Sequence, residues 1–291
     1  MICAAPAPSL LEYYRATYRP MRLVGKSPRT LIAYETALGQ WQRFSAKTPI
    51  DLIDARMLAE FQAKLLQTVA AASVNCYCRH LLAILRYYAE EDGLLRAPRW
   101  RKLKEPKRVP LALTVEEFSR VLAAADDWPG CIGGVAAGPW WKALLLVAWD
   151  TGLRFSALME LRAVDFRGDG VYCQPETQKD AEGQWFTLPP DTVAAVQAVQ
   201  RRGARLFPCH VQAQTIGRWF RIILDHAGIY APKGSGCRFH RIRRSKASYT
   251  KAAGGDATRE LGHSQPSVTE RYYDPRICGR TGGVTMPRPI S

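Results

Sequence analysis

The chain lacks the features that mark secreted and membrane proteins. Its first residues, Met1-Ile2-Cys3-Ala4-Ala5-Pro6, have neither the charged start nor the apolar core of a secretory signal. The apolar stretch from Trp140 to Trp149 is too short to span a bilayer and predicts a buried helix instead. We therefore expect a cytoplasmic protein with no membrane partner.

The eight cysteines also lack the spacing of a metal site. Cys76 and Cys78 lie within an expected helix and have no second pair near them. Cys209 and Cys237 each have a histidine close by in sequence but do not complete four-ligand spacing. We expect reduced cysteines, no bound metal and no cofactor.

Acidic residues are comparatively few, with 26 Asp and Glu against 41 Lys and Arg and a net charge of +15. The surplus is uneven: residues 1–110 hold 18 basic and 9 acidic residues, residues 111–200 hold 6 and 12, and residues 201–291 hold 17 and 5. Two positive segments suit a polyanion held from two sides, although a generally basic soluble protein has the same composition. Charge alone therefore does not distinguish an enzyme from a binding protein.

Residues 97–110 divide the chain, because three prolines and a run of charges interrupt the helical periodicity there. We predict a helical domain over residues 1–96, a basic linker over residues 97–110, and a second domain over residues 111–291. The linker's charge suits contact with the backbone of a nucleic acid.

The first domain is expected to be a small four-helix lobe. One helix is expected over Leu10 to Tyr18, and Ser27-Pro28 is typical of a helix start. Further helices are expected after Asp54 and through the apolar stripe from Val74 to Tyr88.

The second domain is expected to be mixed. Thr114-Val115-Glu116-Glu117 is a capping box that opens a helix, and strands are expected at Val171–Cys173 and Trp185–Leu188. More helices are expected at Asp191, near Gln212, after Phe239 and near Tyr272. The whole is α+β and mainly helical, with helices around a small antiparallel sheet.

Four short motifs carry chemistry, and they are Thr151-Gly152-Leu153-Arg154, His240-Arg241-Ile242-Arg243, Leu261-Gly262-His263-Ser264 and Arg271-Tyr272-Tyr273. Each alone also suits ordinary structure: a helix entry, a surface pair, a glycine helix stop or packed rings. Together they supply arginine forks for phosphate oxygens, histidines that transfer protons near neutrality, and a nucleophilic tyrosine oxygen. That set can break a phosphodiester covalently.

In their order and spacing the motifs resemble the tyrosine recombinase, or phage integrase, family. Tyr272 follows His263 by nine residues, as the family's nucleophile commonly does, and Thr269 occupies the family's threonine position, so that Tyr273 is the weaker candidate. The resemblance implies a core-binding domain before the linker and a catalytic domain after it. It also implies double-stranded DNA as the partner and a nucleoid-associated location.

The resemblance implies catalytic roles for Arg154, Lys179, His240, Arg243, His263 and Tyr272. The two arginines would hold the non-bridging phosphate oxygens and the histidines would bond to the phosphate. Lys179, in the connection between the two expected strands, would protonate the departing 5′ oxygen, although a solvated turn lysine is the alternative. The product would be a 3′-phosphotyrosyl bond, formed without metal or nucleotide.

Two departures from the family are visible: Ala157 stands where an acidic residue is common, and the stretch between Arg243 and His263 is shorter than in chromosome-dimer resolvases.

Two alternatives stay open, a type IB topoisomerase and a non-catalytic DNA-binding accessory protein with the same fold. For a recombinase we expect a tetramer on paired DNA sites, and the tail from Asp274 to Ser291 is either an arm that reaches a neighbour or disordered. The sequence names neither the DNA site nor a directionality factor.

Overall fold

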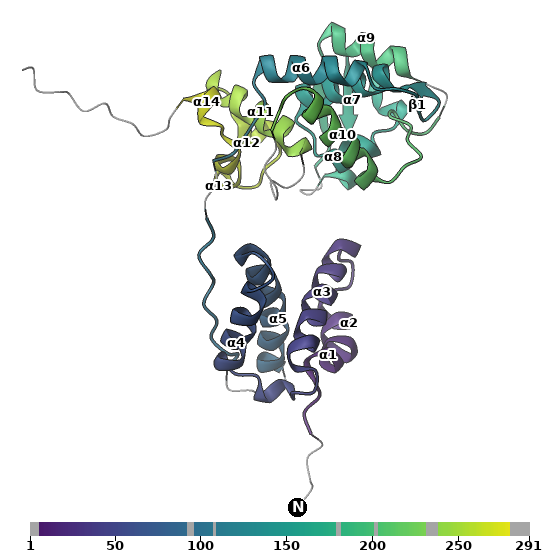
Figure 1. Cartoon of the computed structure of the whole chain (residues 1–291). Helices are drawn as coiled ribbons and strands as arrows, with labels where there is room; N and C mark the ends of the chain where they lie inside the picture. Colours follow the sequence, from purple (N-terminus) through teal and green to yellow (C-terminus); the bar gives the residue numbers. More distant parts are fainter. Residues whose placement is uncertain are drawn as a thin grey trace, which may run out of the picture. The chain divides into compact units, whose positions relative to one another are not determined.

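The chain forms two compact units, Met1–Lys107 and Arg108–Ser291 (Figure 1). The computed structural model describes residues 6–91, 96–106, 109–178, 182–200, 203–230 and 238–279. Each unit has its own hydrophobic core.

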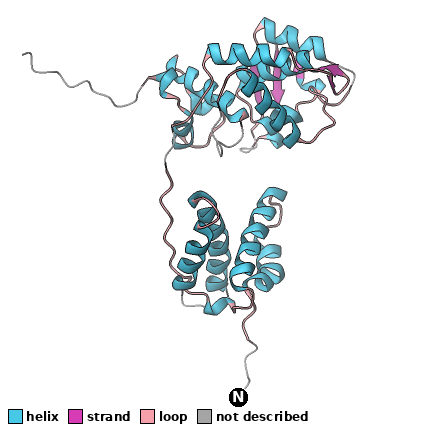
Figure 2. Ribbon diagram, viewed as in Figure 1, coloured by secondary structure: helices cyan, strands magenta, loops and turns pink. Residues whose placement is uncertain are grey.

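The N-terminal unit is built from helices, which are cyan in Figure 2. They are α1 (Leu10–Tyr13), a π-helical turn (Tyr14–Tyr18), α2 (Arg19–Arg22), α3 (Pro28–Ser45), a 3-10 turn (Ile50–Leu52), α4 (Ala55–Leu66) and α5 (Ala71–Glu91). Local sequence explains where they begin. The Ser27 side chain accepts the Thr30 N–H at the start of α3, and the Asp54 side chain accepts the Met57 N–H at the start of α4.

Aromatic rings fill much of the N-terminal core. Trp41 of α3 and Phe61 of α4 meet edge to face with ring centroids 5.2 Å apart. The hydroxyls of Tyr18 and Tyr34 lie 2.9 Å apart, so two buried polar groups satisfy each other.

Part of the expected linker packs on this unit. Trp100 and Leu103 contact the N-terminal core. The Asn75 side chain accepts the Leu103 N–H at 2.9 Å and donates to the Leu103 carbonyl at 3.0 Å. Residues 100–103 are therefore held on α5 by a side chain that satisfies both backbone groups of one residue.

The C-terminal unit contains helices and two small sheets. Its helices are α6 (Val115–Asp126), α7 (Ala137–Thr151), α8 (Phe155–Glu160), α9 (Pro190–Val199), α10 (Ala213–His226), α11 (Phe239–Ala252), α12 (Ala257–Glu260), α13 (Pro266–Thr269) and α14 (Pro275–Cys278), with 3-10 turns at Ala163–Asp165, Pro175–Thr177 and Glu270–Tyr272. The capping box predicted at Thr114 and Glu117 is confirmed.

The sheets are antiparallel. One consists of β3 (Phe166–Arg167), β4 (Gly170–Cys173) and β5 (Gln184–Thr187) in that order, and the other pairs β1 (Cys131–Ile132) with β2 (Val135–Ala136). The two expected strands correspond to β4 and β5, so the α+β prediction is confirmed. β1, β2 and β3 were not predicted, because two-residue strands have no periodicity to detect.

Helix α7 lies at the centre of the C-terminal core and packs against α6, α9 and α11. Trp140 and Trp141 of α7 are fully buried, and the planes of their rings are nearly perpendicular. Trp140 donates its indole N–H to the Pro208 carbonyl at 3.0 Å, which satisfies the one polar atom of that ring. Among the described residues, no helix is long and apolar enough to cross a membrane.

Candidate active site

The first motif terminates α7 and begins α8. Gly152 ends α7 in the left-handed conformation, with φ +65°, and a Cβ built there would lie 2.8 Å from a Leu261 methyl. The Thr151 hydroxyl donates to the Val147 carbonyl and accepts the Leu153 N–H at 3.2 Å. This turn brings Arg154 to the N-cap of α8.

Arg243 connects three of the motifs. It lies on α11 with only 2% of its surface exposed. Nη1 donates to the Gly152 carbonyl and Nη2 to the Leu261 carbonyl, each at 2.6 Å, and Nη2 also lies 3.0 Å from His263 Nε2. The segments at residues 152, 243 and 261–263 are therefore locked together around one guanidinium.

These contacts fix the tautomer of His263. Because a guanidinium only donates, His263 Nε2 accepts and the ring proton belongs on Nδ1. Nδ1 lies 2.8 Å from the hydroxyl of Thr269, which is fully buried. The Thr269 hydroxyl thus accepts the Nδ1 proton and thereby orients the His263 ring.

Tyr272 lies beside both histidines. Its ring centroid is 5.0 Å from that of His263 and 6.2 Å from that of His240. Tyr273 takes a different environment, since Lys251 Nζ lies 4.2 Å from its ring centroid and burial raises the pKa of its phenol. The two adjacent tyrosines therefore have different surroundings, with the histidines beside Tyr272 and a lysine beside Tyr273.

His240 is partly buried at the start of α11. Burial lowers its pKa, and the positive charges of Arg243, Arg244 and Arg154 lower the pKa further. The ring is therefore neutral at pH 7 and able to accept a proton.

Of the six predicted site residues, five lie in this neighbourhood. Lys179 lies outside the described residues. Ala157, in place of the common acidic residue, is fully buried in the C-terminal core. Among the described residues, no group of histidine, cysteine, aspartate and glutamate side chains has the arrangement of a metal site.

Several residues that shape the site were not identified from the sequence. Ser245 exchanges hydrogen bonds with both backbone groups of Leu113, at 2.8 and 2.9 Å. Ser248 accepts the Asp274 N–H at 2.9 Å. The group of small side chains on α11 (Ser245, Ala247 and Ser248) was the available signal, but the hydrogen-bond partners of the two serines are distant in sequence.

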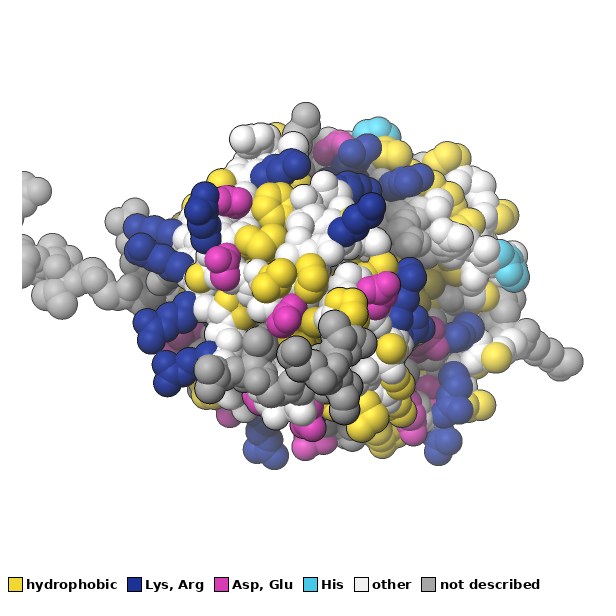
Figure 3. All heavy atoms as spheres, turned by 90° about the horizontal axis from the view of Figure 1, so that it is seen from below, with side chains coloured by type: hydrophobic (Ala, Val, Ile, Leu, Met, Phe, Trp, Pro, Cys, Tyr) yellow, Lys and Arg dark blue, Asp and Glu magenta, His cyan; other side chains and the backbone are white. Residues whose placement is uncertain are grey.

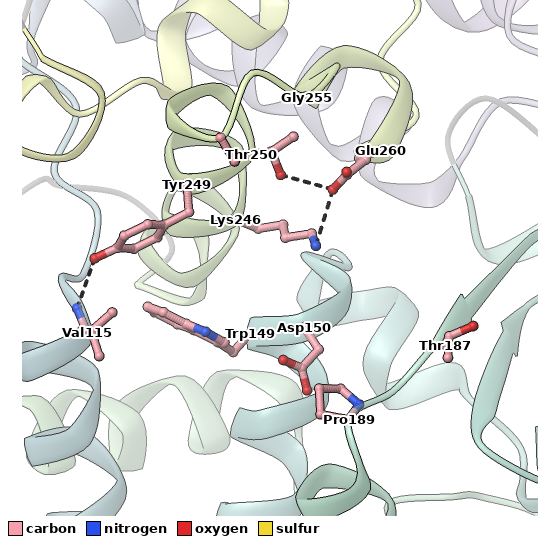
Figure 4. Close-up of a pocket in the computed structure, with 11 residues that line it drawn as sticks. Val115, Trp149, Asp150, Thr187, Pro189, Lys246, Tyr249, Thr250, Gly255 and Glu260 are labelled. Carbon is pink, nitrogen blue, oxygen red and sulfur yellow. Dashed lines mark hydrogen bonds and ion pairs between the residues drawn. The ribbon is translucent and has the colours of Figure 1, made fainter.

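A separate cavity of about 560 Å³ lies beside α11, away from the histidines. Figure 4 shows Lys246 and Thr250 directed toward Glu260, with Trp149 and Asp150 on the other side of the cavity. Lys246 pairs with Glu260 at 3.2 Å, and the Glu260 carbonyl accepts from Gln184 of β5 at 3.2 Å. The ion pair holds α12 against α11, and the hydrogen bond from Gln184 ties it to β5.

Basic side chains are widely spread on the surface. Figure 3 shows Lys and Arg side chains in dark blue around one face of the molecule, with Asp and Glu interspersed.

Structures of tyrosine recombinases share the fold of this chain. The lambda integrase tetramer bound to a Holliday junction matches over 96% of this chain and 80% of its own, with a TM-score of 0.74 and 20% identity. The Tn1549 transposon integrase in complex with circular intermediate DNA matches over 92% and 95%, with a TM-score of 0.71 and 16% identity. XerH recombinase bound to palindromic difH substrate matches over 84% and 76%, with a TM-score of 0.67 and 16% identity.

At such identities the likeness establishes the fold, which is that of the tyrosine recombinases. No protein-family model matches the sequence. No curated protein matches it at a significant level.

Proposed function

We propose that the protein is a site-specific DNA recombinase or integrase that cleaves and rejoins DNA strands through a 3′-phosphotyrosyl intermediate. The observation that carries the proposal is the arrangement around Arg243. One buried guanidinium binds the turn before Arg154 and the turn before His263, and the Tyr272 ring lies next to both histidines. This arrangement supports the proposal because it brings together residues of four separated motifs, among them the two arginines proposed to bind phosphate and the proposed nucleophile.

In the proposed cleavage step the Tyr272 oxygen attacks the scissile phosphorus, forming an O–P bond as the P–O5′ bond breaks. Arg154 and Arg243 stabilise the negative charge of the transition state. The phenol proton must leave as the oxygen attacks. Neutral His240 accepts it, because His263 Nε2 already accepts from Arg243.

The departing 5′ oxygen takes a proton from Lys179 in this scheme and leaves as a hydroxyl. Rejoining is the reverse reaction with the 5′ hydroxyl of a second strand. The phosphodiester energy is retained in the tyrosyl ester, so that atoms and charges balance without a metal or a nucleotide cofactor.

The test uses duplexes with a randomised central sequence and a nick that lets a short cleaved fragment diffuse away. Adducts that survive SDS are captured on filters and their DNA is sequenced. We expect an adduct from the unchanged protein and from Tyr273→Phe, and none from Tyr272→Phe. Adduct formation by Tyr272→Phe at the normal rate would remove the nucleophile assignment.

The same DNA distinguishes the alternatives. Relaxation of supercoiled plasmid without strand exchange between two captured sites would favour a type IB topoisomerase. Sequence-selective binding without any adduct would favour a non-catalytic accessory protein.

For DNA binding and assembly, we propose that residues 1–96 contact duplex DNA and that four protomers assemble on paired sites, since exchange between two duplexes needs four cleavages.

Residues 274–278 are bound to their own chain, so a truncation after Pro275 would disturb the active site itself. Truncation after Gly279 tests the arm without that effect. Mass measurement on paired sites should show a tetramer for the full chain, and normal assembly and exchange after truncation would exclude the arm.

A further inference from the structure

The residues that follow Tyr272 are tied to the beginning of the catalytic unit. Asp274 is fully buried, and its carboxylate accepts the N–H of Ala112 at 2.8 Å, 162 positions earlier in the chain. Arg276 donates to the Ala112 carbonyl at 2.9 Å and to Glu117 Oε1 at 3.0 Å. Arg276 Nη2 also lies 2.8 Å from Asp274 Oδ2. We call Ala112, Glu117, Asp274 and Arg276 the latch.

The latch is connected to Tyr272 through α11. The N–H of Asp274 donates to Ser248 Oγ at 2.9 Å, and Ser248 Oγ donates to the carbonyl of Tyr272 at 3.4 Å. Ser248 is fully buried on the helix that carries His240 and Arg243. The backbone of Tyr272 is thus held between that helix and the latch.

The charges of the latch complement one another. Burial opposes ionisation of Asp274, but hydrogen bonds from Arg276 and from the Ala112 N–H outweigh it and lower the pKa of the carboxyl. Arg276 is 44% exposed, whereas its partners Glu117 and Asp274 are 19% and 0% exposed. Charged hydrogen bonds to a buried carboxylate such as that of Asp274 are stronger than ion pairs between fully exposed side chains, so the pairing of Arg276 with Asp274 is suited to fixing the position of this segment.

We propose that Asp274, Arg276 and Glu117 are positioning residues that hold Tyr272 beside the histidines of its own chain. The proposal rests on the proposed role of Tyr272 as nucleophile. A misplacement of about 1 Å at a reacting group can cost roughly 100-fold in rate, so loss of the latch should slow cleavage without weakening DNA binding.

Three variants separate positioning from folding. Arg276→Ala removes the central cation. Glu117→Gln removes one charge but keeps the capping box of α6, because glutamine serves at that position as well. Arg162→Ala is the matched control: Arg162 is 52% exposed and pairs at 3.2 Å with Asp165, which is 3% exposed, so the variant loses a similar ion pair elsewhere.

Each variant is compared in the full chain by three measurements, which are the rate of adduct formation at saturating captured DNA, the dissociation constant for that DNA, and hydrogen exchange of the peptide spanning residues 270–278. We expect Arg276→Ala and Glu117→Gln to lower the adduct rate by roughly 10- to 100-fold. The dissociation constant should change less than about twofold, and exchange in residues 270–278 should increase. Arg162→Ala should change neither the rate nor the exchange.

Unchanged rate and exchange in Arg276→Ala would overturn the proposal, and so would equal effects in Arg162→Ala. If the unchanged protein forms no adduct, the proposed function fails, but the exchange comparison still decides whether the latch holds the segment. The two failures are therefore distinguishable.

Discussion

Replacing Arg243 should destabilise the C-terminal unit, because this buried side chain donates to two backbone carbonyls, and it should also abolish cleavage if Arg243 has the proposed role at the phosphate. In Arg243→Ala the Gly152 and Leu261 carbonyls lose their 2.6 Å donors in a buried environment. Each unsatisfied buried acceptor costs about 1–3 kcal/mol, and removal of a buried charge offsets part of that sum. We expect a net loss of about 3 kcal/mol in the free energy of unfolding.

For a unit of this size a loss of about 3 kcal/mol corresponds to a fall in melting temperature of roughly 6–12 °C. Differential scanning calorimetry of the full chain should show this fall in the C-terminal transition and leave the N-terminal transition in place. The melting temperature of Arg243→Lys should lie between those of the unchanged protein and Arg243→Ala, since a single ammonium group cannot reproduce the planar guanidinium that donates to both carbonyls. The matched control is Arg244→Ala at the next position of α11, where the side chain is only partly buried. A melting temperature of Arg243→Ala within about 1 °C of the unchanged protein would refute this reasoning.

Three further predictions concern pH, the linker and DNA binding. Because the pKa of His240 is lowered in the folded protein, stability is present above the unfolded-state pKa of about 6.5 and is lost as pH falls below it. When the pH is lowered from about 8 to about 5.5, the melting temperature of His240→Asn should therefore fall less than that of the unchanged protein. Equal falls would argue against a lowered pKa of His240. Asn75→Ala should release residues 100–103 and speed tryptic cleavage after Arg101 and Lys102, with Gln67→Ala as control; equal cleavage rates would contradict the docking. Residues 1–107 should bind duplex DNA with an affinity that falls steeply with salt, and an affinity independent of salt would exclude phosphate contacts.

Much of the fold follows from local sequence. The caps at Ser27, Asp54 and Thr114 act within four residues, so the starts of α3, α4 and α6 were predictable. The strands β1, β2 and β3 were not, because their two-residue pairings depend on neighbours and not on their own pattern. Helix α14 was not expected either, since it is one turn long and begins at Asp274, whose partners lie at residues 112 and 248.

The sequence predicts a set of candidate site residues but not the hydrogen bonds that connect them. Motif spacing favours Tyr272 over Tyr273 as the nucleophile, which stays a prediction, and the structure places the Tyr272 ring beside His240 and His263. The hydrogen bonds from Arg243 to two backbone carbonyls could not be predicted, because every residue has a backbone carbonyl and the sequence does not mark which ones accept. Arg276 and Glu117 are 159 positions apart, and only the fold brings them together.

The most direct test of the central claim is to locate the amino acid that carries DNA in the trapped adduct. Trypsin cleaves after Arg271 and Arg276 and so releases Tyr272-Tyr273-Asp274-Pro275-Arg276 as one peptide. After nuclease digestion, fragmentation of that peptide in a mass spectrometer should place a nucleotide on the Tyr272 oxygen. A nucleotide on Tyr273, or on any other peptide, would contradict the account.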